Sequence, residues 1–362
     1  MSAELVEVVR SGFVESVHRG SVVALDAAGG VVVKVGEPDA PHLPRSANKP
    51  LQLVGMLRAG LDLPPPDLAV AASSHSGETP HVRRVRDLLN GNSLPESSLV
   101  CPPALPLGED AARAVLAAGG GPARAFMNCS GKHTAMVLTC VANGWPVVGY
   151  AQPDHPLQVA IRATVEDLAG EPVGAVAVDG CGAPLFGLTL TGLARAFARL
   201  VTAEPGSPER RVADAMRAHP DLVGGAGRDV TALMAGAPGV LAKDGAEGVY
   251  AAALPLGEDA ARAVLAAGGG PARAFMNCSG KHTAMVLTCV ANGWPVAGYA
   301  ESDHPLQVVL RGTVEDLAGE PVGAVGVDGC GAPLFGLTLT GLARAFARLV
   351  TAEPGSPERR VA

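Results

Sequence analysis

The chain repeats a long part of itself. Residues 104–213 recur as residues 253–362, and these two copies of 110 residues differ at only seven positions. The differences, such as Ile161 to Leu310, are ones that a packed domain tolerates. Solenoid repeats are shorter units stacked several times, so two long copies separated by 39 residues do not fit that architecture. The independent sequence is therefore 252 residues, and the pattern fits a recent tandem duplication or an error in joining the sequence.

Composition excludes several classes of protein. The chain is 48% hydrophobic and 17% charged, with a net charge of −7, which is ordinary for a globular protein with a substantial core. Basic residues are scattered and aromatic residues make up 3%, so neither a phosphate-binding stripe nor a base-stacking surface is present. No apolar run is long enough to span a bilayer, and residues 1–20 lack the apolar core of a signal peptide. From composition we therefore expect a cytoplasmic protein without nucleic acid or membrane partners.

Apolar periodicity predicts mixed secondary structure. Short strands are expected at residues 5–9, 21–26, 31–35, 68–73 and 175–178. Helices are expected to begin at Pro50, at Thr79, after Asn128 and at Pro156. Four of the seven cysteines are independent, which is too few for a disulfide framework, so we expect free thiols.

The lysines are the first candidates for chemistry. The chain has five lysines against 23 arginines, and only lysine can lose its proton in a desolvated site. Ser46 and Lys49 are three residues apart at a predicted helix start, which places an amine beside a hydroxyl on one face. A helix-capping serine with a solvated lysine is the commoner meaning of this short pattern. Lys132 and Lys243 also lie near serine, cysteine or aspartate in the sequence.

A second group of residues could bind a metal ion. Cys129 and His133 flank a predicted helix start, and Cys181 follows the predicted strand at 175–178. Because imidazole is a far commoner zinc ligand than an amine, the residue types alone favour these three side chains as ligands. The other interpretation is that both cysteines are buried as small apolar residues.

Five motifs occur in one order across about 250 residues: Arg-Ser-x-x-Lys-Pro, Ser-His-x-Gly-Glu, Asn-Cys-Ser-Gly-Lys-His, Asp-Gly-Cys-Gly-x-Pro and Lys-Asp-Gly-x-Glu-Gly. In these motifs the chain resembles the rhizobial-type L-asparaginase family, also called the asparaginase II family, from residue 1 to about 253. The resemblance implies an α+β fold similar to serine β-lactamases and glutaminases, with a central, mainly antiparallel sheet flanked by helices. It also implies hydrolysis of L-asparagine, a small-molecule substrate, to aspartate and ammonia, and we expect a homodimer.

The resemblance further assigns roles to individual residues. It implies two serine–lysine dyads, Ser46 with Lys49 and Ser74 with Lys243, and it places Arg45 and Asp179 in the substrate site. It implies a Zn²⁺ ion held by Cys129, Lys132 and Cys181, so that a lysine takes the place of His133. We expect Ser46 to attack the side-chain amide with Lys49 as base, while Ser74 and Lys243 relay the proton or stabilise the intermediate. The sequence leaves the reverse assignment of the nucleophile open.

The chain departs from the family at its second copy. Residues 1–252 should form the catalytic domain, but the sequence restarts at Ala253 where the closing part of that domain is expected. Residues 253–362 repeat Cys278, Lys281 and Cys330, yet they contain no counterpart of the serine–lysine dyads, so this duplicate is not an independent catalytic domain. Two other interpretations remain: a penicillin-recognising serine hydrolase or other amidase, against which the absence of a Lys-Thr-Gly strand argues, and an inactive product of duplication.

Overall fold

The chain forms two compact units in the computed structural model. Residues 3–10, 13–237, 239–254, 285–286, 288–289, 292–327, 332–353 and 356 are described. Unit 1 comprises Met1–Leu5 with His18–Gly257, and unit 2 comprises Val6–Val17 with Glu258–Ala362. The first copy of the repeat therefore folds within unit 1, whereas almost all of the second copy belongs to unit 2. Cys278, Lys281 and Cys330 lie outside the described residues.

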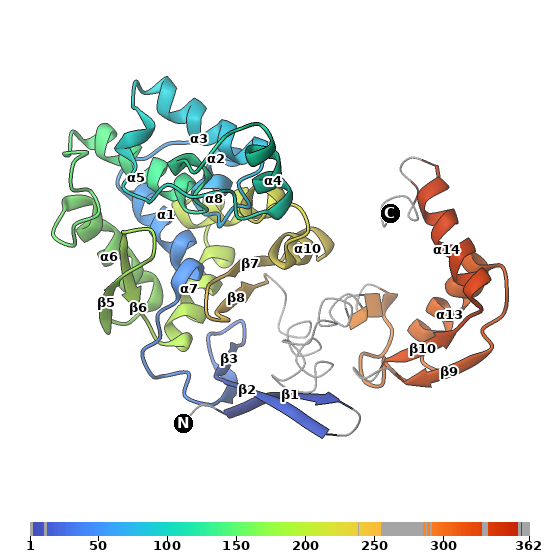
Figure 1. Cartoon of the computed structure of the whole chain (residues 1–362). Coiled ribbons are helices and arrows are strands. Elements are labelled where there is room, and N and C mark those ends of the chain that lie inside the picture. Colours follow the sequence, from blue (N-terminus) through green and yellow to red (C-terminus); the bar gives the residue numbers. More distant parts are fainter. Residues whose placement is uncertain are drawn as a thin grey trace. The chain divides into compact units, whose positions relative to one another are not determined.

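Unit 1 is mainly helical (Figure 1). Its helices are α1 (Lys49–Arg58), α2 (Pro65–Ala71), α3 (Thr79–Gly91), α4 (Glu109–Ala117), α5 (Ser130–Asn143), α6 (Pro156–Ala169), α7 (Leu190–Thr202), α8 (Pro208–Ala218), α9 (Pro220–Val223) and α10 (Asp229–Gly236), with short 3-10 turns η1 (Arg45–Asn48), η2 (Glu96–Ser98) and η3 (Arg124–Phe126). Helix α1 is buried along almost its whole length and packs against α5, α6 and α8. A Cβ atom at Gly55 would lie 3.0 Å from the Cα atom of Ile161, so glycine allows α6 to approach α1 closely.

The strands form pairs. They are β1 (Ala3–Arg10), β2 (Phe13–Gly20), β3 (Val22–Leu25), β4 (Val31–Val35), β5 (Ala175–Val178), β6 (Pro184–Gly187), β7 (Leu241–Asp244), β8 (Tyr250–Ala253), β9 (Ala324–Val327) and β10 (Pro333–Gly336). Each strand pairs with its neighbour in sequence, and the β3–β4, β5–β6, β7–β8 and β9–β10 pairs are antiparallel. The class is α+β, as expected. Within the described ranges, however, the structure has these two-stranded sheets and not the expected central sheet. The second copy of the repeat begins at Ala253, which is the last residue of β8.

Most of the predicted elements that position the site are confirmed. Helices begin at Thr79, after Asn128 and at Pro156, and strands occupy the expected places at 31–35 and 175–178. The strand predicted at 68–73 is wrong, because this stretch lies in and after α2. A short apolar run of this length is compatible with either a buried strand or a buried helix. The prolines at 64–66 favour the helix, because the fixed φ of proline suits the first helical turn.

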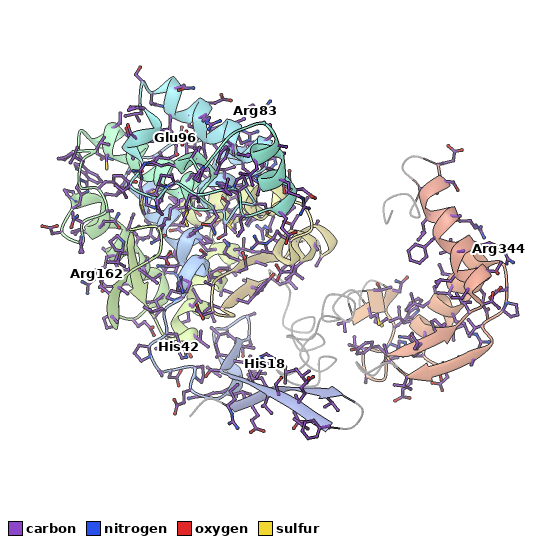
Figure 2. The ribbon with its side chains drawn as sticks, viewed as in Figure 1. His18, His42, Arg83, Glu96, Arg162 and Arg344 are labelled. Atoms are coloured by element: carbon purple, nitrogen blue, oxygen red, sulfur yellow. The ribbon has the colours of Figure 1, made fainter. Side chains whose placement is uncertain are left out.

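Unit 2 repeats the local structure of the first copy. Helices α13 (Pro305–Ala318) and α14 (Leu339–Thr351) correspond to α6 and α7, and they pack against each other as those two do. Arg162 on α6 (Figure 2) binds Glu166 at 3.0 Å, and its counterpart Arg311 binds Glu315 at 3.1 Å. A small core joins the described part of this unit: Val286, Cys289, Tyr299 and Leu306. Where the second copy is described, its nearly identical sequence thus gives the same elements and local contacts as the first copy.

The described part of the chain can be compared with the expectations for its cysteines and for membrane-spanning helices. Its five cysteines are all free and buried, which confirms the prediction of thiols for Cys101, Cys129, Cys140, Cys181 and Cys289. None of the helices that can be examined is both long and apolar enough to cross a membrane.

Candidate active site

The first part of the site is the turn that leads into α1. Arg45 begins η1 with a φ of 49°, a left-handed conformation that is uncommon outside glycine and is frequent at functional sites. The backbone N–H of Lys49 donates to the carbonyl oxygen of Ser46, so the turn runs directly into the helix. Ser46 is half-buried, whereas the side chain of Lys49 is fully buried in the first turn of α1.

Ser74 lies in a buried, extended segment that follows α2. The backbone N–H groups of Ser74 and Ser76 donate to the carbonyl oxygens of Val223 at 3.0 Å and Gly224 at 2.9 Å. The four residues 73–76 are almost completely buried although all are polar. Burying polar groups is unfavourable unless they are hydrogen-bonded, so this segment is held by specific partners rather than by apolar contact.

Two lysine amines converge on the Ser74 hydroxyl. The Nζ atom of Lys49 lies 3.0 Å from Ser74 Oγ, and the Nζ atom of Lys243 lies 2.9 Å from the same oxygen. Lys49 also donates to the carbonyl oxygen of Ser73 at 2.6 Å. Among the hydrogen bonds of the described residues, none joins the Ser46 hydroxyl to either amine. The residues of both expected dyads therefore lie in one region, with Ser74 bonded to both lysines.

Lys243 reaches Ser74 because strand β7 ends against the turn η1. A Cβ atom at Gly245 would lie 2.9 Å from the carbonyl oxygen of Pro44, so only glycine allows this close approach. Burial lowers the pKa of Lys243 to about 8, the neighbouring Asp244 carboxylate raises it, and the positive charges of Lys49 and Arg228 lower it. A lysine with this pKa exchanges its proton readily near neutral pH.

The two charged residues expected to bind substrate form an ion pair. Arg45 Nε donates to Asp179 Oδ1 at 3.2 Å, and Arg45 also faces the exposed carboxylate of Glu247 at 3.6 Å. Asp179 follows β5, and its Oδ1 atom accepts a second hydrogen bond from the Gly180 N–H at 2.9 Å. A guanidinium and a carboxylate thus lie together beside Ser46.

The expected metal ligands also come together. Lys132 Nζ lies 3.2 Å from Cys181 Sγ. Interaction with the neighbouring Cys181 thiol, assisted by Lys49 and Lys132, holds the pKa of Cys129 well below its ordinary value, against the opposing effect of burial. Burial acts to lower the pKa of Lys132, but the two sulfur atoms outweigh burial and raise it. One thiolate beside an ammonium group is therefore the favoured charge state.

Helix α5, which carries Lys132 and directly follows Cys129, starts very close to α2. A Cβ atom at Gly131 would lie 2.1 Å from the carbonyl oxygen of Val70, so α5 could not begin there with any other residue. This contact brings Cys129 and Lys132 next to the segment that carries Ser74.

The ligand set favoured by residue types alone is not formed. His133 Nδ1 is bonded to the Tyr150 hydroxyl at 2.6 Å, and among the described residues no group of three His, Cys, Asp or Glu side chains is placed to hold a metal ion. The set of Cys129, His133 and Cys181 is therefore wrong. Two buried sulfur donors and one buried nitrogen donor, from Cys129, Cys181 and Lys132, do suit Zn²⁺ chemically, provided that the lysine gives up its proton.

Sequence reasoning did not identify several residues that hold the site together. Asp244 binds the Lys243 amine, and His75 and Ser130 bind each other beside Ser74 and Cys129. Each is the direct sequence neighbour of a predicted site residue and belongs to one of the five motifs, and these were the signals that the sequence offered. Their contacts depend on which elements pack together.

A comparison with protein families identifies the chain. Serine hydroxyls beside buried lysines are groups that hydrolases use to attack amides and esters. The family model described as L-asparaginase II matches residues 6–259 and, separately, residues 251–362. The chain therefore belongs to the L-asparaginase II family and contains a repeated segment of it, as the motifs predicted. A comparison with curated proteins gives no match.

Proposed function

We propose that the protein hydrolyses L-asparagine to aspartate and ammonia. Family membership supports this substrate and reaction. The observation that carries the proposal is that the amines of Lys49 and Lys243 lie 3.0 Å and 2.9 Å from one buried hydroxyl, that of Ser74. This chain of proton-carrying groups begins at Lys49, three residues after Ser46, and the half-buried Ser46 supplies a second hydroxyl.

Ser46 is the nucleophile in this mechanism, because it is the more exposed of the two serines. Its oxygen attacks the side-chain amide carbon of asparagine while the neutral amine of Lys49 takes the hydroxyl proton. The C–N bond then breaks, the proton passes to the departing nitrogen, and ammonia leaves an ester on Ser46. Water attacks that ester and gives aspartate, with its proton returned through the same groups.

Ser74 and Lys243 serve as the proton relay. The Ser74 hydroxyl lies between the two amines, so it can pass a proton from Lys49 to Lys243 and back. Lys243, with its pKa of about 8, is present in both charged and neutral forms near neutral pH. It can therefore accept a proton during attack and supply one to the leaving group.

Arg45 and Asp179 are the groups that hold the ends of the substrate. The guanidinium is suited to the α-carboxylate of asparagine, and the carboxylate of Asp179 is suited to the α-ammonium group. In the structure the two side chains form an ion pair, with Arg45 Nε 3.2 Å from Asp179 Oδ1. Binding exchanges this ion pair for two ion pairs to the substrate, which places the side-chain amide at a fixed distance from Arg45 and its neighbour Ser46.

Cys129, Lys132 and Cys181 would hold Zn²⁺. When bound, the ion supplies a fixed positive charge that can orient a polar substrate group or brace the site. We expect Cys181→Ser to lower the zinc content of the purified protein, measured by elemental analysis against the wild type. A zinc content independent of Cys181 would contradict this ligand set, whatever the activity of the variant.

The nucleophile can be assigned by ammonia release and by trapping the ester. Ser46→Ala should abolish release of ammonia from L-asparagine, whereas Ser74→Ala should slow turnover and leave a measurable rate. In rapidly quenched wild-type protein, mass spectrometry should find the aspartyl ester on the tryptic peptide 46–58, which contains Ser46, and not on peptide 59–83, which contains Ser74. Full turnover by Ser46→Ala, or an ester on peptide 59–83, would reverse the two roles. A folded wild-type protein that releases no ammonia would overturn the function itself.

A further inference from the structure

His75 is a fully buried residue with no part in the mechanism above, although it directly follows Ser74. The N–H of Gly77 donates to its Nδ1 atom at 3.1 Å, so Nδ1 carries no proton. Its Nε2 atom must then carry the proton, and it lies 2.9 Å from the hydroxyl oxygen of Ser130. The Ser130 hydroxyl in turn donates to the carbonyl oxygen of Ala125 at 2.9 Å. A single neutral tautomer satisfies every one of these bonds.

The charge state of His75 agrees with this network. Burial, reinforced by the neighbouring His81 and Lys49, holds the pKa of His75 well below its ordinary range. A protonated ring would lose the bond from Gly77 and would place an unpaired positive charge in the interior.

The bond from His75 to Ser130 joins two parts of the site. His75 belongs to the extended segment that carries Ser74, and Ser130 is the first residue of α5, next to Cys129 and two residues before Lys132. The backbone bonds of Ser74 and Ser76 connect that segment to residues 223–224, not to α5. Among the described side chains of the segment 73–76, His75 alone has a hydrogen bond to α5.

We propose that His75 is a positioning residue, which fixes the Ser74 hydroxyl relative to Cys129 and Lys132 by donating a hydrogen bond to Ser130. Its ring never touches the substrate. The inference rests on the proposed function, since it assumes that Ser74 relays protons at a site completed by the start of α5.

His81 offers a matched control. Its ring is also buried and stacks on that of His75, with centroids 5.1 Å apart and planes 10° apart. Its Nε2 atom is bonded to the carbonyl oxygen of Asp221 at 2.9 Å, away from Ser130. A substitution at His81 therefore disturbs the same packing without cutting the bond to α5.

Three variants test the proposal by steady-state kinetics on the full chain. In His75→Asn the short amide can still accept from Gly77 but cannot reach Ser130, and we expect kcat to fall by about 10-fold to 100-fold with KM nearly unchanged. His75→Gln retains a donor long enough to reach Ser130 and should recover most of the rate. His81→Gln should lower the melting temperature while leaving kcat close to wild type. Wild-type kcat in His75→Asn, or an equal loss in His81→Gln, would overturn the positioning role.

Hydrogen exchange provides a readout that does not depend on activity. The segment 73–77 lies outside the repeated sequence, so its peptides can be assigned to one place in the chain. The backbone amides of this segment should exchange faster in His75→Asn than in His81→Gln. Ser130→Ala removes the same hydrogen bond from the other side and should give the same exchange rates as His75→Asn. It therefore provides a second test if His75→Asn folds poorly. Unchanged exchange in both variants would exclude the link. If the wild type releases no ammonia, the proposed function fails while this measurement still decides whether His75 holds the segment.

Discussion

Three of the four lysines that the structure describes are buried, and the surroundings of two of them, Lys132 and Lys243, shift the pKa in opposite directions. Lys132 faces two sulfur atoms that raise its pKa, and burial lowers the pKa of Lys243 to about 8. A buried ammonium group is rare because it loses the hydration of its charge. The same residue type can therefore hold a positive charge at one place in this site and transfer a proton at another.

The pKa of Lys243 predicts how activity depends on pH. The neutral amine is the form that accepts a proton from Ser74, so kcat/KM for L-asparagine should rise with pH through a limb near pH 8 and then level off. Asp244→Asn removes a charge that raises this pKa and should move the limb to lower pH. Arg228→Gln removes a charge that lowers it and should move the limb to higher pH. Shifts in the same direction in the two variants would show that another group controls the limb.

The same group predicts how stability depends on pH. The ordinary pKa of lysine, 10.5, applies to the unfolded chain, whereas the folded value is about 8. Between these values the unfolded state binds more protons than the folded state, so the contribution of Lys243 to the free energy of unfolding increases with pH across this window and is flat below it. Urea denaturation at a series of pH values, with Lys243→Met as the control that lacks this slope, measures the effect.

Sequence spacing predicted where residues lie within one element but could not predict which distant residues bond to each other. Ser46 and Lys49 are three residues apart, so local helix geometry was enough to place them at the start of α1. The bond from Lys49 to Ser74 joins residues 25 positions apart in sequence. It exists because α2 turns the chain back toward α1, and no local pattern encodes that return.

Helices α7 and α14 have the same thirteen-residue sequence but very different surroundings. Phe197 on α7 has 0% of its surface exposed, whereas its counterpart Phe346 on α14 is 62% exposed. Helix α7 packs against α6, α8, β3 and β8, while α14 retains only the contact with α13 among the corresponding elements of the described chain. Local sequence therefore determines the helix, and the neighbouring elements determine its burial.

Alanine substitution at this pair measures the difference. Phe197→Ala should lower the free energy of unfolding of unit 1 by about 3–5 kcal/mol, since it leaves a cavity in a packed core. Phe346→Ala should change that of unit 2 by less than about 0.5 kcal/mol. The chain has two tryptophans, Trp145 in unit 1 and Trp294 in unit 2, so replacing one by Phe lets fluorescence follow the other unit during urea denaturation. Equal losses for the two variants would mean that α14 is buried in solution.

The elements themselves were predictable where periodicity and end signals agreed. Helix α3 has one apolar face and one charged face, and it begins with Thr79 and Pro80. Both its type and its start were therefore predicted from the sequence. Helix α2 is seven residues long and buried, with too few turns for a helical period to emerge. Pairing of strands into a larger sheet depends on contacts between distant segments. The central sheet was expected only from the family resemblance, and the described residues show two-stranded sheets instead.

For the whole molecule, the duplication leaves one copy of the repeat without the partners that the other has. Only one set of α1, β3 and β7–β8 is present in the sequence, and the first copy folds with it in unit 1. In its described residues, the second copy retains the counterparts of α6, β5, β6 and α7, namely α13, β9, β10 and α14. Leu339, Leu342 and Phe346 line one side of α14 at helical spacing and are 85%, 44% and 62% exposed. A continuous apolar stripe of this kind on a surface favours association with other molecules.

This stripe predicts self-association of the full chain. The average molar mass from light scattering should rise with protein concentration, because burying the stripe between molecules removes apolar surface from water. The double variant Leu342→Gln with Phe346→Gln should abolish that rise and should release ammonia from asparagine at the wild-type rate, since neither residue lies near Ser46 or Ser74 in sequence or belongs to unit 1. The matched double variant Leu193→Gln with Phe197→Gln places the same changes in the packed face of α7 and should unfold unit 1 instead. A wild-type mass that stays constant with concentration would mean that the second copy covers this face within its own molecule.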